Sequence, residues 1–179
     1  MSEPKSTFAS LGFPGHLLIP FLALLTMPWL WQPASGLTWT KGLVVLAAGL
    51  AAWTLLEYLL HRFVLHGVEP FKDWHRQHHL NPEIPMRIPV VFSLALVIAL
   101  IVLPALLAAP GISMVFSSGL LLGHLLQESV HHDLHKPASG SWFVARWRDH
   151  DLHHHSNSCA NYGTLTGFWD SIFKTRAGQ

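Results

Sequence analysis

The chain has 179 residues, of which 50% are hydrophobic and only 12% are charged. Soluble domains carry about 25% charged residues, so this composition excludes an ordinary soluble domain and favours a membrane protein. The formal net charge is +1 and no run rich in Lys and Arg occurs, which argues against nucleic acid as a partner. The single Cys159 excludes an internal disulfide and a cysteine-rich zinc site.

Four apolar runs are candidates for membrane spans, since crossing the hydrocarbon layer takes roughly 20 helical residues. They cover residues 11–31, 42–60, 90–109 and 112–127. The first run is long and ends in "PWLWQP", which fits a retained span better than a cleaved signal peptide. Pro110 and Gly111 predict a tight turn between the last two runs. The predicted fold is therefore all-α, with four transmembrane helices in two hairpins.

The distribution of basic residues predicts the orientation of these spans. With four spans, ten of the eleven Lys and Arg residues lie on the side that holds both termini, and Lys41 alone lies on the other side. The positive-inside rule makes the first side cytosolic. Residues 61–89 and 131–179 are then expected to form a cytosolic helical cap on a single membrane domain spanning residues 1–179.

Ten of the fourteen histidines occur in four closely spaced groups. They are His61 and His66; His75, His78 and His79; His131 and His135; and His150, His153 and His154. The i, i+3, i+4 spacing of "HRQHH" and "HDLHH" places three imidazoles on one side of a helix. His61 and His66 are about 140° apart on a regular α-helix. Both can bind metal only if they flank the metals or if the helix bends.

Ten nitrogen donors exceed what one ion can use, so the grouping predicts two metal ions. Imidazole suits Zn, Cu, Fe and Ni, so the spacing alone does not identify the metal. A lone histidine is more often hydrogen-bonded or solvated than metal-bound, and this interpretation applies to His16, His132 and His155. His132 stays an alternative to His131, which is favoured because it forms an i, i+4 pair with His135.

Four stretches resemble the histidine boxes of the fatty acid hydroxylase and sterol desaturase superfamily, a group of integral-membrane di-metal oxygenases. They are "EYLLHRFVLH" (57–66), "HRQHH" (75–79), "HHDLH" (131–135) and "HDLHHH" (150–155). The stretch "NYGTLTGFWDSIFKT" (161–175) resembles the closing segment of the superfamily. The first stretch is similar in particular to the fatty acid 2-hydroxylase branch, which acts on the acyl chains of sphingolipids.

The resemblance implies the ligands, the metals and the co-substrate. Two irons are expected during turnover, with zinc as an ion that can occupy the site in isolated protein, and O2 is the expected co-substrate. No catalytic residue is implied beyond the metal ligands. The implied ligands are His61, His66, His75, His78, His79, His131, His135, His150, His153 and His154.

Two features depart from the pattern of the eukaryotic 2-hydroxylases. Only eight residues separate His66 from His75, which leaves the substrate class open. No cytochrome b5 domain with an "HPGG" signature precedes the first apolar run. The electrons are therefore expected from a separate protein, such as a cytochrome b5-like protein, a ferredoxin or a reductase.

Glu57, His124 and Glu128 are ionisable residues within reach of the predicted membrane region, where such groups are costly and often functional. Glu57 lies four residues before His61, and Glu128 lies three residues before the third histidine group. We predict that both carboxylates accept the second N–H of a ligating histidine. His124 is expected either to contact a ligating histidine or to face the substrate. Asp170 is expected to be a structural element of the cap, with pairing to a ligand as the alternative.

Two irons held by neutral imidazoles are suited to oxidising an unactivated C–H bond with O2. The predicted function is hydroxylation or desaturation of a membrane lipid, with an acyl chain preferred. A carotenoid or sterol oxygenase shares the metals and the reaction and is the nearest alternative. A membrane metal-binding or metal-transport protein is the alternative from another class. A transporter should carry ligands near the bilayer midplane, whereas these histidines lie at one face.

Overall fold

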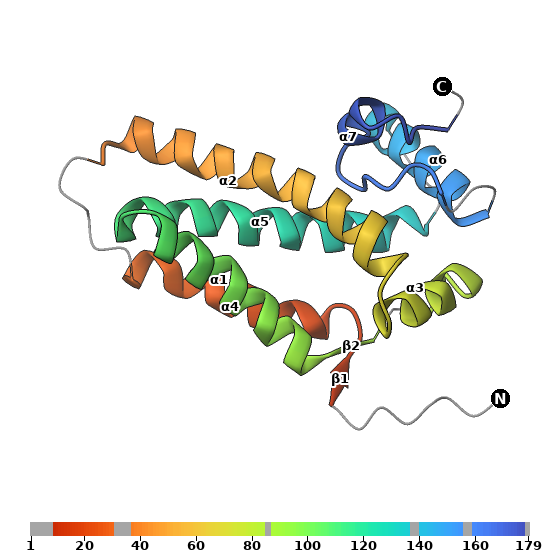
Figure 1. Ribbon diagram of the computed structural model, residues 1–179, viewed down its shortest axis with the longest axis horizontal. Coiled ribbons are helices and arrows are strands. Elements are labelled where there is room, and N and C mark those ends of the chain that lie inside the picture. Colours follow the sequence, from red (N-terminus) through yellow and green to blue (C-terminus); the bar gives the residue numbers. More distant parts are fainter. Residues whose placement is uncertain (1–8, 31–36, 85–86, 137–139, 156–158, 178–179) are drawn as a thin grey trace. The chain divides into compact units, whose positions relative to one another are not determined.

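The computed structural model of the protein describes residues 9–30, 37–84, 87–136, 140–155 and 159–177 (Figure 1). This part of the chain is mostly helical, as predicted. Trp31, at the end of the first predicted span, lies outside the described residues. The chain divides into two compact units, each built from two segments. Unit 1 comprises Met1–Ala51 and Met86–Leu125, and unit 2 comprises Ala52–Pro85 and Leu126–Gln179.

Unit 1 contains apolar helices and a pair of two-residue strands. Strand β1 pairs antiparallel with β2, and helix α1 packs against α4 (Figure 1). The strands are too short to leave a periodic pattern, so they were not predicted from the sequence. In chain order the elements are β1 (Ser10–Leu11), η1 (Gly15–Leu17), α1 (Leu18–Leu30), the first part of α2 (Trp39–Leu59), β2 (Ile88–Pro89), α4 (Val90–Leu107) and the first part of α5 (Pro110–Leu134).

The first apolar run becomes helical later than predicted. Its α-helix begins at Leu18 rather than near residue 11, after the strand β1 and the short 3-10 helix η1. Pro14 stands at the N-terminal end of η1, where its missing N–H and restricted φ favour a helix start. The 13 residues of α1 span about 20 Å, which is shorter than a typical membrane-crossing helix.

The turn between α4 and α5 lies two residues earlier than predicted. Ala108 leaves the helix with extended dihedrals (φ −143°, ψ 165°), and α5 already begins at Pro110. Proline is favourable at the first position of a helix because no N–H is needed there. Ser117 of α5 donates a hydrogen bond to the carbonyl oxygen of Leu100 at 2.7 Å, which ties α5 to α4.

Two helices in the described part of the chain are long and apolar enough to cross a membrane, Trp39–Leu65 and Val90–Leu107. Much of the side-chain surface of α4 is apolar and exposed, including Ile98 and Leu107. Apolar surface of this kind is unfavourable in water and favourable in lipid. The two helices thus indicate a membrane protein, whereas the predicted four spans stay a prediction.

Unit 2 holds all ten histidines that the sequence proposed as ligands. Its helix α3 packs against η2, and Trp53, Tyr58 and Leu134 belong to its buried core. The elements are the end of α2, the π-helix η2 (Leu60–Leu65), α3 (Phe71–Leu80), the end of α5, α6 (Ser141–His155) and α7 (Phe168–Ile172).

Candidate metal centre

A π-helix solves the spacing problem of His61 and His66. Helix α2 ends at Leu59 and continues directly as η2, in which the N–H of His66 donates to the carbonyl oxygen of His61 at 3.2 Å. This bond spans five residues instead of four, so the turn is wider and residues five apart lie closer in direction than on a regular α-helix. The two imidazole centroids are 5.2 Å apart. The spacing required the helix to bend, or the two histidines to flank the metals, if both bind metal. In the structure the α-helix changes to a π-helix at Leu60.

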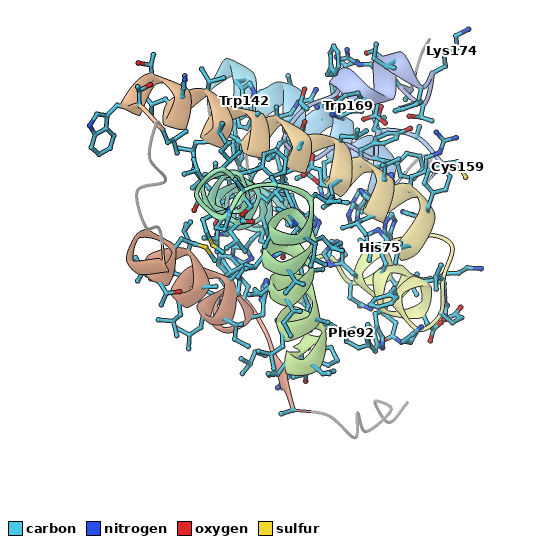
Figure 2. All side chains as sticks on the ribbon, turned by 60° about the vertical axis from the view of Figure 1, so that its left-hand side comes forward. His75, Phe92, Trp142, Cys159, Trp169 and Lys174 are labelled. Atoms are coloured by element: carbon cyan, nitrogen blue, oxygen red, sulfur yellow. The ribbon has the colours of Figure 1, made fainter. Side chains whose placement is uncertain are left out.

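Five imidazoles of unit 2 form one compact group, called here the first group. Their ligand nitrogens lie within 4.8 Å of one another. The Nε2 atom of His75, a residue labelled on α3 in Figure 2, is 2.9 Å from that of His61 and 3.0 Å from that of His79. The members are His61, His66, His75, His79 and His153.

Four further imidazoles form the second group, whose ligand nitrogens also lie within 4.8 Å of one another. The Nε2 atom of His78 is 3.2 Å from that of His131 and 3.0 Å from that of His135. His150 lies beside this group, with its Nε2 atom 3.4 Å from that of His135, but is not one of the four. The members are His78, His131, His135 and His154.

Each histidine triplet contributes to both groups, which differs from the single direction that its spacing predicts. His78 belongs to the second group and its neighbour His79 to the first, and His153 and His154 divide in the same way. Adjacent residues on an α-helix are about 100° apart, so two neighbouring imidazoles diverge. One triplet can therefore supply ligands to two separate ions.

The donor atoms fit metal ions. Nitrogens bound at 2.0–2.1 Å around one tetrahedral zinc are roughly 3.3 Å apart, and the Nε2 atoms of neighbouring members lie close to that spacing. The Nε2 atoms of His66 and His153, for example, are 3.1 Å apart. Several nitrogen lone pairs that converge repel one another unless a cation lies between them. Each group is therefore suited to hold one ion.

Backbone carbonyls orient two members of the first group. The Nδ1 atom of His61 is 2.6 Å from the carbonyl oxygen of Tyr162, and that of His153 is 2.6 Å from the carbonyl oxygen of Ala160. A carbonyl oxygen only accepts, so both Nδ1 atoms carry the proton and both Nε2 lone pairs are left for a metal. Sequence reasoning missed these acceptors, because a backbone carbonyl has no residue signature.

Burial keeps the clustered histidines neutral, which is the form that binds metal. Desolvation, with the charge of neighbouring histidines, lowers the pKa of His78 to about 4 and that of His79 to about 3. Desolvation likewise lowers the pKa of His153 to about 4, although its backbone hydrogen bond opposes the shift. The imidazoles of both groups are therefore uncharged at neutral pH, and each neutral ring keeps one N–H.

These shifts predict how the stability of the metal-free protein depends on pH. The pKa of an unfolded histidine is near 6.5, whereas burial lowers the pKa of His78, His135 and His153 to about 4 in the folded protein. Between these values the unfolded chain binds more protons than the folded chain, so the free energy of unfolding decreases as pH falls. Thermal unfolding of metal-free protein in detergent should show a falling Tm from about pH 6.5 towards about pH 4. A flat profile over this interval would contradict the assigned burial.

The other candidate residues have distinct surroundings. Glu57 accepts hydrogen bonds from the backbone N–H groups of Thr164 and Leu165. Its predicted role as acceptor for the N–H of a ligating histidine stays a prediction. The charge of Glu128 acts to raise the pKa of His78, against the effect of burial. His124 is a buried residue of unit 1.

The histidines that the sequence set aside are not members of either group in the described part of the chain. His16 is buried in unit 1. His155 is exposed, and its Nε2 atom is 3.7 Å from the Oδ1 atom of Asp151. His132 follows His131 on α5. The structure thus places His131, rather than its neighbour, among the clustered nitrogens.

Comparisons with known proteins find related hydroxylases. A dihydroceramide fatty acyl 2-hydroxylase of Arabidopsis thaliana is 28% identical over 173 residues, which cover 85% of this chain and 73% of the relative. The fatty acid 2-hydroxylase of Rattus norvegicus is 32% identical over 148 residues. That match covers 75% of this chain but 39% of the rat protein, so the chain spans well under half of the length of this relative.

A solved structure and a family model also match this chain. A solved structure of full-length scs7p, in which only the hydroxylase domain is visible, matches with a TM-score of 0.74 at 21% identity. It covers 91% of this chain and 67% of that chain, and shows a shared fold. The family model described as "Fatty acid hydroxylase" matches residues 46–175, which include all four histidine boxes. The chain therefore belongs to the fatty acid hydroxylase family.

Proposed function

We propose that this chain is a membrane-bound, non-haem di-iron oxygenase that hydroxylates the acyl chain of a membrane lipid at carbon 2. The observation that carries the proposal is the pair of histidine groups, five and four imidazoles with converging Nε2 atoms. The named relatives act on fatty acyl chains of ceramides or on fatty acids, which supports a lipid substrate.

Hydroxylation of one C–H bond uses one molecule of O2. One O2 supplies one oxygen atom to the C–H bond and the other to water, which consumes two electrons and two protons. Two irons, when bound, supply the activation of O2. The chain holds them through the ten proposed histidines, and the carbonyls of Ala160 and Tyr162 keep the Nε2 lone pairs of two of these directed at the ion. The electrons come from a separate donor protein.

The proposed membrane arrangement places the site at the cytosolic face of a single domain. Four spans, in the apolar runs that contain α1, α2, α4 and α5, put ten of the eleven basic residues on the cytosolic side. The histidine groups begin at the end of the apolar helix Trp39–Leu65. An acyl chain could then enter from the bilayer while the headgroup stays at the interface, which favours oxidation near the headgroup end.

Lipid analysis tests the proposal. The chain should be produced in cells that lack such an activity, and acyl chains released from their lipids should be examined by mass spectrometry. We expect species heavier by one oxygen, with the hydroxyl on carbon 2. Oxidised sterols or carotenoids would move the assignment to the alternative substrates. An unchanged lipidome with altered cellular metal would instead indicate a metal-binding or metal-transport protein.

A further inference from the structure

Two buried carboxylates hold four successive peptide N–H groups of one segment, residues 160–165. Asp170 accepts from the N–H of Tyr162 at 2.8 Å and from that of Gly163 at 2.9 Å. Glu57 accepts from the next two N–H groups, at 3.1 and 2.9 Å, through a single oxygen atom, Oε1. Residues 160–165 are called here the carboxylate-held segment.

The burial of these carboxylates makes their hydrogen bonds strong and their loss costly. Asp170 is 1% exposed and Glu57 is 5% exposed. A buried carboxylate needs donors, and Asp170 has them on both oxygens, whereas the Oε2 atom of Glu57 is buried without a hydrogen-bond partner in the described residues. Asp170 also accepts from the hydroxyl of Thr175 at 2.8 Å. The two side chains thus fix the path of the backbone rather than contacting solvent.

The same segment supplies both carbonyls that orient the first group. The peptide unit joining Tyr162 to Gly163 donates its N–H to Asp170 and offers its C=O to the Nδ1–H of His61. A peptide unit is planar, so fixing its N–H also fixes the direction of its C=O. Hydrogen bonds in such a chain polarise one another, which strengthens the bond to the imidazole.

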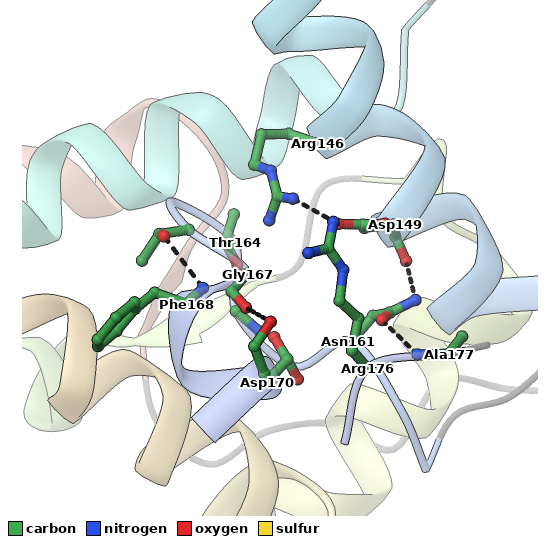
Figure 3. A network of polar contacts seen from close by, with 12 residues as sticks. Arg146, Asp149, Asn161, Thr164, Gly167, Phe168, Asp170, Arg176 and Ala177 are labelled. Carbon is green, nitrogen blue, oxygen red and sulfur yellow. Dashed lines mark hydrogen bonds and ion pairs between the residues drawn. The ribbon is translucent and has the colours of Figure 1, made fainter. Parts of the chain in front are cut away.

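The second carbonyl, that of Ala160, is held in a similar way. The carbonyl of Ala160 belongs to the peptide unit whose N–H, on Asn161, donates to the carbonyl oxygen of Thr175 at 2.8 Å. The side chain of Asn161 joins Asp149 to Ala177, as Figure 3 shows. Since Thr175 also donates to Asp170, this carboxylate supports the peptide units of both histidine contacts.

The two carbonyls of the segment contact members of the first group, His61 and His153. The buried Nδ1 atoms of His75 in the first group, and of His78 and His154 in the second, have no hydrogen-bond partner in the described residues. The two contacts of the segment with a ligand nitrogen are therefore both in the first group. The carboxylate-held segment acts on the first group alone.

We propose that Asp170, assisted by Glu57, is a positioning residue that controls metal binding at the first group through the peptide units of residues 160–163. It fixes the proton on Nδ1 and the ring orientation of His61 and His153, and it leaves the second group unaffected. This inference rests on the proposed function, in which both groups bind metal. It replaces the alternative that Asp170 pairs directly with a ligand.

The decisive variant is Asp170→Asn, tested in the full-length protein by metal titration with Zn²⁺ and with Co²⁺. The amide keeps the shape of the carboxylate but places an NH2 group against one of the two peptide N–H groups. Substitutions in groups that orient metal ligands lower metal affinity by about 10–100-fold. We expect one of two ions to bind that much more weakly, with a changed Co²⁺ absorption spectrum and an unchanged affinity for the other ion.

A matched variant controls for other contacts of the same tail. Trp169→Phe removes the hydrogen bond from the indole N–H of Trp169 to the hydroxyl of Thr54 and should keep both ions.

The outcomes separate the inference from the proposed function. Unchanged affinity for both ions in Asp170→Asn would overturn the inference, and so would an equal weakening of both. If the unchanged protein binds no metal, the proposed function fails instead. Where Asp170→Asn does not accumulate, Thr175→Val carries the test, since it removes one donor to Asp170. It should weaken one ion only, and unchanged binding of both would again overturn the inference.

Discussion

His153→Ala should abolish hydroxylation and remove one of the two bound metals. The imidazole of His153 is fully buried, and its Nε2 atom is 3.1 Å from that of His66. Truncation removes a donor from the first group and leaves a cavity among the remaining ligands. Because even the loss of an outer partner of a metal ligand costs about 10–100-fold, loss of the ligand should reduce activity by at least about 100-fold.

The matched control for this change is His155→Ala. His155 is close by on α6 but is exposed and belongs to neither group. It should keep most of the activity and both metals. Product formation and bound metal per chain, measured together on the two purified variants, check the prediction. Equal losses at the two positions would show that the ligand assignment is wrong.

Gly119→Val should prevent unit 1 from folding. In that unit α2 and α5 approach so closely that a Cβ atom on Gly119 would lie 2.3 Å from the carbonyl oxygen of Leu46 and 2.9 Å from the Cα atom of Gly49. These are backbone atoms and cannot rotate away, so the helices must separate. Overpacking typically costs about 1–3 kcal/mol even where side chains can move, and a larger cost is expected here.

Gly42→Ala provides the control for helix propensity. It lies on α2 as Gly49 does, but a Cβ atom at this position has nothing within 4 Å. Alanine favours a helix over glycine by about 1 kcal/mol, so Gly42→Ala should be neutral or stabilising. Thermal unfolding of both variants in detergent compares them directly. A Gly119→Val protein as stable as Gly42→Ala would rule out the close helix contact.

Local spacing was informative where neighbouring residues share one helix. The i, i+4 spacing predicted that His131 and His135 would lie together, and both fall in the second group. The apolar runs likewise predicted the helix that begins at Val90. The family resemblance, which rested on the four boxes, is confirmed by the match over residues 46–175.

Other features depend on contacts that no local pattern records. The i, i+5 bond of η2 brings His66 beside His61, although regular helix geometry separates them by about 140°. The acidic residue Glu57 holds backbone N–H groups more than a hundred positions away in the chain, and those groups leave no mark on the sequence. The backbone partners of Glu57 could therefore not be inferred from spacing.

The sequence by itself determined the chemistry: the density of histidine, the scarcity of cysteine and charge, and the helical spacing restrict the chain to a membrane protein with imidazole donors. Only the tertiary structure decided which imidazoles lie in the same group. Adjacent imidazoles diverge by about 100° on a helix, so the partners of His78 and His79 depend on which other histidines lie on each side of α3. Those neighbours come from α5, α6 and η2, which only folding brings together.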